Sequence, residues 1–464
     1  MNRTVGIPLL GKGSTNHLHR PEILEAFMLQ GINVRFLVRE DYINLVTRLP
    51  GAEYVPCVFR APSGWRAQAL GLCEYIRRMY PAWDDDRRRR FKYAQMERRG
   101  LLARLAHRMC FMLARHRCAV SLIAAMEPLF YGHDAVNGVD ARALSMLLLL
   151  GVGTVDSELE GVVTSWARKK SVPVIHIVGN YDNLSSKGFR GVRVDRLLVW
   201  GPNMRDDAVG LHGIKPEGVS MIGPVRYSYI RNVLYPSREA FLASIGLDPA
   251  KKTILFGGFL MEYHYFEMLE ILEQLRATGE DCQLILRIYP NKSLLTSTYM
   301  KPLKDYASRL PGVYVSIGDP HYDKGEKDRE VLHIEEKELW NAFNYCDVVV
   351  NIFSTMSLEA CLFDKPAVNM WYFPKTSKNM LRAPVYHDYS LLYHNRRIVS
   401  YGAIRTARNR RELKNMISKA LVNPAELAGE RRRTVELECG TIDGRSCDRI
   451  VQACVDGLNG GMSN

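Results

Sequence analysis

The sequence predicts an α/β protein with two successive domains, each built on a parallel sheet. The chain has 464 residues, of which 47% are hydrophobic. A chain of this length exceeds what one hydrophobic core usually organises, so two domains of about 200 residues each are expected. Strand-like and helix-like segments also alternate along the chain in two separate series, a pattern typical of βαβ units with right-handed crossovers.

The first series defines an N-terminal domain over residues 1–228. It opens with the strand "TVGIPLL" (4–10), the loop "GKGSTNH" and the helix "RPEILEAFMLQG", in which Pro21 suits a first turn and Gly31 a C-terminal cap. Later strands are expected in "NVRFLV", "LSMLLLLGVG", "VPVIHIV", "RLLVWG" and "VSMIG". A basic helical insertion is expected over about 84–126.

The second series defines a C-terminal domain over residues 229–430. Its strands are expected in "KTILFGGFL", "CQLILRIYP", "VYVSIG", "DVVVNIF" and "AVNMWYF", separated by helical segments. Residues 431–464 are expected to form a helical tail.

Composition favours a cytoplasmic protein. The ten cysteines include no C-x-x-C pair, so the sequence predicts neither disulfides nor a metal site and fits a reducing compartment. The N-terminus turns to Gly and Lys before an apolar core is long enough for a signal peptide, and the longest apolar run, 144–153, is far shorter than the roughly 20 residues of a membrane span.

Positive charge gathers in one segment of a chain whose net charge is +13. Residues 87–117 contain eleven Lys or Arg and one acid, Glu97. One helical face carries Leu102, Leu105, Met109, Leu113 and Val120, and Arg104, His107, Arg108 and Arg115 lie roughly opposite. We expect peripheral contact of 87–117 with anionic lipid at the inner face of the cell membrane, or with an acidic acceptor. Alternatively, the helix packs on the sheet with a solvated basic face. Nucleic-acid binding is not expected, because aromatic residues are not interleaved with the arginines along the segment as stacking platforms would need.

The stretch "IFSTMSLEACLFDKPAVNM" (352–370) places polar side chains at the joint between a buried strand and the next helix. The first N–H groups of a helix lack intrahelical partners and carry partial positive charge, so such a joint can seat an anion. Ser354 and Thr355 can donate to a phosphate there. In the plainer alternative, one of them only caps the helix and Glu359 lies on a solvated face.

Part of this stretch, "SLEACLFDKPAVN", resembles the E-A-x-x-x-G-x-P-V-V segment of GT-B glycosyltransferases. Glu359, Ala360 and Pro366 match that segment, whereas Asp364 replaces its glycine. The resemblance implies two Rossmann-like domains that face a central cleft and bind a nucleotide-sugar donor, with Glu359 contacting the donor ribose or sugar. Asn351 stands where retaining families often carry a second glutamate, which favours an inverting reaction.

A second segment, "LILRIYPNK", is similar to the R-x-H-P element of bacterial capsule, sialyl and glycerophosphate transferases. Arg287 matches it and could neutralise a pyrophosphate, and Tyr289 stands in place of a nucleotide-contacting histidine. Alternatively, Arg287 is an arginine at a strand end on the surface. The glycines after "ILF" would allow close approach of the donor. The expected donor-binding residues are Gly257, Gly258, Arg287, Tyr289, Ser354, Thr355, Ser357 and Glu359.

A third segment, "HIVGNYDNLSSKGFRGVRVDRLLVWG", resembles the W-D-N-L-T-S-K-G and D-R-L-L-V-W-G pattern of bacterial GT-B-like proteins of surface-polysaccharide loci. Tyr181 replaces the tryptophan of that pattern. The resemblance implies a loop on the acceptor side of the cleft that contains Asp182, Asn183, Ser185 and Lys187. By themselves, "DN" and "SSKG" predict only a turn.

The loop "GKGSTNHLHR" (11–20) lies where inverting GT-B enzymes often place a catalytic histidine or a glycine-rich acceptor loop. His17 is the first candidate for a general base, because a histidine can take a proton from an acceptor hydroxyl near neutral pH. Asp156 and Glu158 are alternative bases or partners that orient it, and Gly13 and Ser14 are expected to bind the acceptor. Alternatively, His17 is an exposed loop residue without a catalytic role.

Together these features predict a glycosyltransferase that moves a sugar from a nucleotide-diphosphate sugar to a polysaccharide or lipid-linked glycan. The reaction is expected to be inverting and independent of metal, since positive side chains and a helix dipole can stabilise the leaving diphosphate, and no cofactor beyond the donor co-substrate is expected. The alternatives are a CDP-polyol phosphotransferase or a nucleotide-sugar 2-epimerase on the same fold. A binding or scaffold protein without catalytic activity is the alternative from another class.

Overall fold

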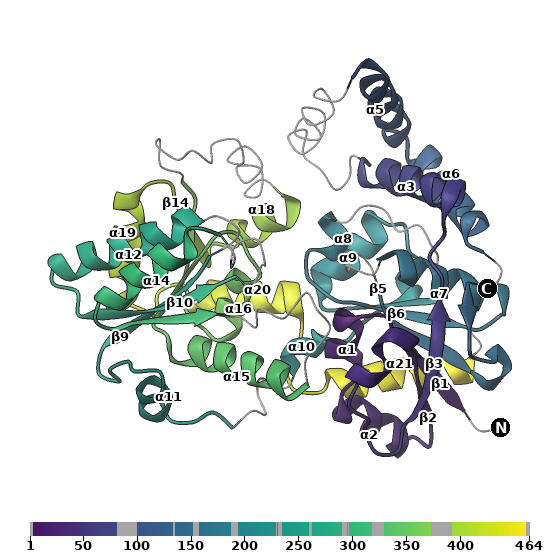
Figure 1. Ribbon diagram of the computed structural model, residues 1–464, viewed down its shortest axis with the longest axis horizontal. Helices are drawn as coiled ribbons and strands as arrows, with labels where there is room; N and C mark the ends of the chain where they lie inside the picture. The colour runs from purple at the N-terminus through teal and green to yellow at the C-terminus, as the bar shows by residue number, and fades with distance from the viewer. Residues whose placement is uncertain are drawn as a thin grey trace. The chain divides into compact units, whose positions relative to one another are not determined.

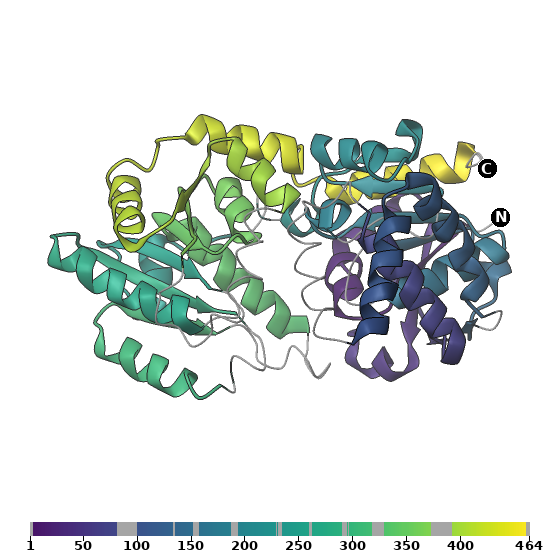
Figure 2. The same ribbon diagram turned by 90° about the horizontal axis from the view of Figure 1, so that it is seen from above.

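The computed structural model describes residues 3–80, 100–132, 135–151, 157–186, 194–228, 230, 234–258, 262–289, 295, 297–317, 329–372 and 392–460. The chain forms two compact units, each with its own sheet (Figures 1 and 2). The first unit comprises Met1–Asn232, Leu392–His394 and Glu436–Asn464, and the second comprises Val233–Leu391 and Asn395–Val435. The expected helical tail therefore contributes to the first unit from Glu436 onward.

The first unit contains an eight-stranded sheet with the order β4-β3-β2-β1-β5-β6-β7-β8. Its pairs are parallel except β3 with β4. The strands are β1 (Thr4–Leu9), β2 (Asn33–Arg39), β3 (Glu53–Phe59), β4 (Val136–Asn137), β5 (Met146–Gly151), β6 (Val174–Val178), β7 (Arg196–Val199) and β8 (Val219–Met221). The helices are α1 (Lys12–Leu18), α2 (Pro21–Leu29), α3 (Gly64–Arg78), α5 (Leu101–Ala114), α6 (Arg117–Met126), α7 (Ser157–Lys169), α8 (Asn183–Ser186), α9 (Pro202–Gly210), α10 (Val225–Ser228) and α21 (Ser446–Gly460).

Both faces of this sheet are covered by helices. Ile7 and Phe36 share one hydrophobic cluster with Phe27 of α2 and Ile450 of α21. The opposite face packs against α7, since Leu149 lies in a cluster with Trp166. The last helix of the chain therefore completes the core that the first strands begin.

The second unit contains a six-stranded parallel sheet with the order β11-β10-β9-β12-β13-β14. Its strands are β9 (Lys252–Gly257), β10 (Cys282–Ile288), β11 (Val313–Ile317), β12 (Val348–Asn351), β13 (Ala367–Met370) and β14 (Ile404–Ala407). Its helices are α11 (Arg238–Ser244), α12 (Glu262–Ala277), α14 (Met300–Arg309), α15 (Arg329–Tyr345), α16 (Met356–Leu362) and α19 (Arg410–Val422). Helices α18 (Tyr393–Ser400) and α20 (Ala428–Cys439) each contain residues of both units.

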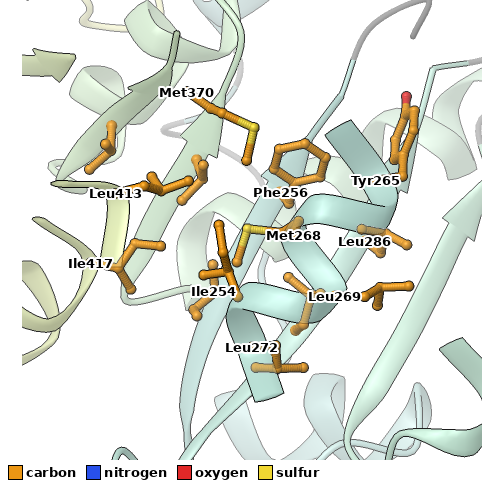
Figure 3. Close-up of a cluster of buried hydrophobic side chains, with 14 of the residues drawn as sticks. Ile254, Phe256, Tyr265, Met268, Leu269, Leu272, Leu286, Met370, Leu413 and Ile417 are labelled. Carbon is orange, nitrogen blue, oxygen red and sulfur yellow. The ribbon is translucent and has the colours of Figure 1, made fainter. Parts of the chain in front are cut away.

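One face of the second sheet holds the main hydrophobic core (Figure 3). Ile254 and Phe256 of β9 pack there with Met268 and Leu272 of α12 and with Leu413 of α19. Successive residues of a strand point to opposite faces. The alternate residues of the same strands, including Gly257, therefore belong to the other face.

The N-terminal loop expected over 11–17 is instead helix α1, so this prediction was wrong. The Ser14 hydroxyl fastens the turn from β1 into this helix: it accepts from the backbone N–H groups of Leu10 (2.9 Å) and Gly11 (3.2 Å) and donates to the Gly11 carbonyl (2.8 Å). These bonds satisfy backbone groups at the helix start, which favours a helix directly after the strand.

Candidate functional site

Both sheets reverse their strand order at one point, between β1 and β5 in the first and between β9 and β12 in the second. In open α/β sheets, ligands bind outside the carboxyl ends of the strands at such a point. Many of the residues expected from sequence follow these four strands. Gly258 follows β9 and Ser354 follows β12, while α1, which contains His17, follows β1 and α7 comes after β5.

A row of aligned residues crosses the carboxyl end of the second sheet. Strand pairing puts one residue from each strand in register, in the order Ser316, Arg287, Gly257, Asn351, Asn369 and Thr406. Aligned residues of a parallel sheet lie on the same face. We call these six residues the polar row, and it lies on the face opposite the core of Figure 3.

Two asparagines of the polar row hold the joint between β12 and α16. The Asn351 carboxamide oxygen accepts from the backbone N–H (3.1 Å) and the hydroxyl (3.2 Å) of Ser354. The Asn369 oxygen accepts from the backbone N–H of Phe353 at 3.3 Å. Phe353 has a positive φ of 42° and its ring packs edge-on against Trp371. This conformation is unfavourable for phenylalanine, so the two asparagines and the aromatic contact hold a strained turn.

Ser357 links the same two asparagines. Its buried hydroxyl lies 3.1 Å from the oxygen of Asn351 and 2.9 Å from that of Asn369. Since backbone N–H groups also point at these oxygens, the orientation of both carboxamides is fixed. Their Nδ2 atoms are buried, as is the Thr406 hydroxyl, and none of the three has a hydrogen-bond partner within the described part of the chain. Buried donors without partners are costly and uncommon, which marks the row as a candidate binding site.

The start of α16 differs from the expected anion seat. Met356 N–H donates to the Ser354 hydroxyl at 3.2 Å, and the N–H groups of Leu358 and Glu359 both donate to the Thr355 carbonyl at 2.9 Å. Ser354 therefore bonds to the helix start as in the plainer alternative, and Thr355 makes no side-chain cap. The other half of that alternative is wrong, because Glu359 is only 2% exposed.

Arg287, a member of the polar row, is anchored by its neighbours. Its Nη1 donates to the Ser316 hydroxyl at 2.7 Å, and that hydroxyl donates to Glu338 of α15 at 2.6 Å. The Glu338 carboxylate lies 3.8 Å from the same Nη1. The Arg287 side chain is 11% exposed, so Arg287 lies near a strand end, as in the plainer alternative, but most of its side chain is covered. Tyr289, just beyond β10, is exposed.

The two glycines after "ILF", Gly257 and Gly258, leave room for the neighbouring side chains of Met356 and Tyr265. A Cβ atom at Gly257 would lie 1.9 Å from the Sδ of Met356, and one at Gly258 would lie 2.3 Å from the ring of Tyr265. Any larger residue would displace these neighbours. Packing therefore explains both glycines without a ligand.

A cluster of two carboxylates near the same edge, of which Glu267 is buried and Glu270 is half-buried, was not predicted. Glu267 of α12 accepts from the Tyr372 hydroxyl at 2.8 Å and from Arg410 Nε at 2.8 Å, and Glu270 pairs with Arg410 at 2.6 Å. Burial, with the nearby Glu267 charge, raises the pKa of Tyr263. Tyr372 and Arg410 follow β13 and β14, over 100 residues from Glu267, so spacing alone could not reveal the cluster.

In the first unit, the structure gives one predicted residue, Ser14, a structural contact and places three others on helices. Ser14 is buried and its hydroxyl bonds to the turn described above, so it is not an open acceptor contact. Gly13 lies in α1, and His17 is half-buried in the last turn of that helix. Glu158 is the second residue of α7. Asp156 and Lys187 lie outside the described residues.

The expected acceptor loop forms the short helix α8 instead. Asn183 and Ser185 are buried, and Asp182 is half-buried. The Ser185 hydroxyl lies 3.3 Å from Nδ1 of His394, whose ring packs edge-on against Tyr181. His394 was not predicted, because it comes from a distant part of the chain that belongs to the first unit.

Comparison with known proteins identifies the fold. No protein-family model and no curated sequence matches the chain. Among solved structures, Staphylococcus aureus MnaA with UDP is similar over 99% of this chain and 97% of its own, with 12% identity and a TM-score of 0.52. A putative UDP-N-acetylglucosamine 2-epimerase from Listeria monocytogenes (11% identity, 99% and 98% covered, TM-score 0.53) and a glycosyltransferase from Rickettsia africae (7%, 98% and 98%, 0.50) are also similar. The chain thus has a GT-B-like fold with two Rossmann-like domains.

Proposed function

We propose that the protein is a glycosyltransferase that moves a sugar from a nucleotide-diphosphate sugar to a polysaccharide or lipid-linked glycan. The observation that carries the proposal is the polar row at the strand-order reversal of the second sheet. It combines one cation, Arg287, with donors of Asn351, Asn369 and Thr406 that have no partner among the residues the structure describes. Hydrogen-bond donors and a guanidinium are the groups that bind a diphosphate and its sugar.

In this proposal the donor lies over the carboxyl end of the second sheet. Arg287 turns from Glu338 to the diphosphate, which offers two negative charges in place of one. Glu359 accepts from a ribose or sugar hydroxyl, and the exposed Tyr289 contacts the nucleotide. The joint beside the donor is formed by Ser354, Thr355 and Ser357. The main role of Ser357 is to hold the two asparagines in place.

The first unit supplies the base. His17 takes the proton of the acceptor hydroxyl as its oxygen attacks the anomeric carbon, the bond from that carbon to the diphosphate oxygen breaks, and the configuration inverts. Arg287 stabilises the charge on the departing diphosphate, so the step needs no metal. Asp156 or Glu158 orients the imidazole or replaces it as base, and Asp182 and Lys187 contact the acceptor.

Epimerisation of a nucleotide sugar at C2 is the second candidate, because solved structures of 2-epimerases share the fold over nearly the whole chain. It differs from transfer in one measurable respect, since it requires no acceptor. Transfer of a polyol phosphate from a CDP donor differs in the nucleotide.

The test has two stages. Binding of UDP, GDP and CDP to the full chain is first measured by calorimetry. We expect UDP or GDP to bind, whereas CDP alone would favour the polyol phosphotransferase and the absence of all binding would favour a scaffold. The matching sugar nucleotides are then incubated with and without a lipid-linked glycan. Release of nucleoside diphosphate only with the acceptor supports the proposal, and a C2 epimer formed without acceptor overturns it.

A further inference from the structure

Helices α3, α5 and α6 form a small helical subdomain between β3 and β4, and they contact one another (Figure 1). They share a core of their own, which contains Ile76, Met79, Cys110, Ala114, Val120 and Ala124. The sequence left open whether the leucine face of α5 packs on the sheet. The structure answers this question.

Helix α5 turns its apolar face outward. Leu101, Leu102, Leu105, Met109, Met112 and Leu113 are between 44% and 83% exposed, and we call them the α5 apolar face. The side packed against α3 and α6 carries smaller or polar residues instead: Ala114 is fully buried and His107 contacts Tyr75. The alternative in which this face packs on the sheet is therefore wrong. Val120 differs from its predicted partners because it belongs to α6 and is buried.

Exposed apolar residues are concentrated in this subdomain. Beyond α5, its surface exposes Trp65 and Leu72 of α3, Leu122 and Met126 of α6, and Leu129 just after α6. Soluble proteins seldom expose apolar surface on this scale without a partner, so the subdomain is an interaction surface.

The charge around the α5 apolar face is positive. Between residues 100 and 132 the basic residues are Arg104, Arg108, Arg115 and Arg117, and the one acid is Glu127. Glu127 is buried and bonds to Arg77 at 2.6 Å, so it offers no negative charge to a partner. Arg108 is three residues from Leu105 and four from Met112, which places it at the border of the apolar face and not opposite it as expected from the sequence.

We propose that the α5 apolar face inserts into an anionic phospholipid membrane, with the flanking arginines at the headgroup phosphates. An amphipathic helix that lies in the bilayer interface needs an apolar face and a cationic border, and both are present here. Helix α5 has 14 residues, about 21 Å, which suits an in-plane helix rather than a span. In the described residues no single helix meets the length and hydropathy of a span, and one bent pair within 104–130 does by length and composition only.

A second copy of the chain fits this surface less well. A symmetric dimer sets the same patch of both subunits face to face, so the arginines of one copy would approach those of the other. Anionic headgroups instead neutralise them. The proposal does not depend on the reaction or on the donor, so it can fail while the proposed function stands.

The test is co-sedimentation of the full chain with vesicles. We expect binding to vesicles of phosphatidylcholine and phosphatidylglycerol (about 7:3), at least about tenfold tighter than to phosphatidylcholine alone, with the difference reduced as salt rises from about 0.05 to about 0.5 M. Leu102→Ser, Leu105→Ser and Met109→Ser together should lower binding about tenfold or more, because they remove buried apolar area but leave the subdomain core intact.

Two further variants make the test specific. Arg108→Gln with Arg115→Gln should remove most of the preference for anionic vesicles while weak apolar binding stays. Leu29→Ser with Val422→Ser, which removes apolar residues that are 85% and 80% exposed outside the subdomain, should bind as the wild type does. Equal binding by the triple variant and the wild type would overturn the proposal. The proposal would also be overturned by a second pair of results. In these, the wild type does not bind vesicles and forms a dimer in sedimentation velocity, and the triple variant is monomeric.

Discussion

Asn351 and Asn369 are register partners on adjacent strands, and one hydroxyl, that of Ser357, lies within hydrogen-bond distance of both carboxamide oxygens. The backbone N–H groups of Ser354 and Phe353 fix the same oxygens. The acceptor side of each carboxamide is therefore used by the chain, and among the described residues the donor side has no hydrogen-bond partner. In each asparagine, the carboxamide oxygen thus has a structural role and the Nδ2 group is a candidate for ligand binding.

Removing the Ser357 hydroxyl should destabilise the second unit. Ser357→Ala removes one hydrogen-bond donor from the buried carboxamide oxygens of Asn351 and Asn369. We expect the free energy of unfolding to fall by about 1–2 kcal/mol and the midpoint of thermal unfolding to fall with it. Ser244→Ala is the matched control. Ser244 is exposed and its hydroxyl donates to the Phe241 carbonyl in its own helix at 2.7 Å, so its loss should cost less than about 0.5 kcal/mol. Equal midpoints for both variants would contradict the role given to Ser357.

A methyl group at Gly257 should displace Met356. Gly257→Ala puts a Cβ atom inside the thioether of Met356, and we expect about 1–3 kcal/mol of destabilisation. Met356→Ala in the same chain should recover part of this loss, which a double-mutant cycle measures by denaturant unfolding. Gly71→Ala is the control: a Cβ there meets nothing within 4 Å, and in the middle of α3 alanine should be neutral or slightly stabilising. Additive effects of the two substitutions would show that Met356 does not limit this position.

Arg287 and Glu359 should matter for the donor more than for folding. Arg287→Ala should weaken binding of the nucleoside diphosphate at least about tenfold, because a charge-assisted bond to phosphate is lost. The affinity of Arg287→Lys should lie between those of the wild type and Arg287→Ala. Glu359→Ala should weaken it too. Calorimetric titration measures all three, with Arg142→Ala as control, since Arg142 is 91% exposed and pairs with Asp140, two residues before it. Unchanged affinity in both alanine variants would contradict the assignment of the donor site.

Most of the fold could be predicted because it depends on local patterns. Alternating apolar strands and amphipathic helices gave the two sheets, and Pro21 and Gly31 correctly bounded α2. The loop expected at 11–17 became α1 because one hydroxyl, that of Ser14, bonds across the turn. A helical wheel also separates the faces of α5 but cannot say which face its neighbours cover, so the exposure of Leu102 emerged only from the structure.

The site was less predictable, because it depends on strand register. The joint at Ser354 was found from its polar residues between apolar ones. Asn369 and Thr406 join it only because β13 and β14 align with β12. A signal was nevertheless present, since an asparagine in the middle of the buried strand "AVNM" is costly unless it is bonded or used.

Thiol reactivity should separate the buried cysteines from Cys118. Burial raises the pKa of Cys57, Cys346, Cys361, Cys447 and Cys454 to about 12, so these thiols stay protonated and unreactive at pH 8. Cys118 is exposed, and a disulfide-exchange reagent should modify it first. Cys118→Ser should remove this fast phase from the native chain but leave nine thiols of the ten reactive in denaturant. A fast phase that persists in this variant would contradict the assignment.

The same thiols imply that stability falls at high pH. Their pKa values are raised from 9.0 in the folded chain, so between about pH 9 and 12 the folded state binds more protons than the unfolded state. Because the unfolded state gains stability by releasing those protons, the free energy of unfolding should decrease as pH rises through this range. Denaturant unfolding at pH 8 and pH 10 measures the change. The same comparison with Cys454→Ala, where one raised pKa is removed, should show a smaller decrease.

His17 should affect turnover without affecting donor affinity. His17→Asn keeps a polar side chain in α1 but removes the base, so we expect kcat to fall by about 100-fold or more. The dissociation constant of the nucleoside diphosphate should stay unchanged, because the proposed donor residues all belong to the second unit. The acidic limb of the pH profile of kcat/KM should disappear in this variant, which loss of packing alone would not cause. His116→Asn, at an exposed position before α6, is the control. If His17→Asn turns over normally and Asp156→Asn or Glu158→Gln does not, a carboxylate is the base and the histidine is structural.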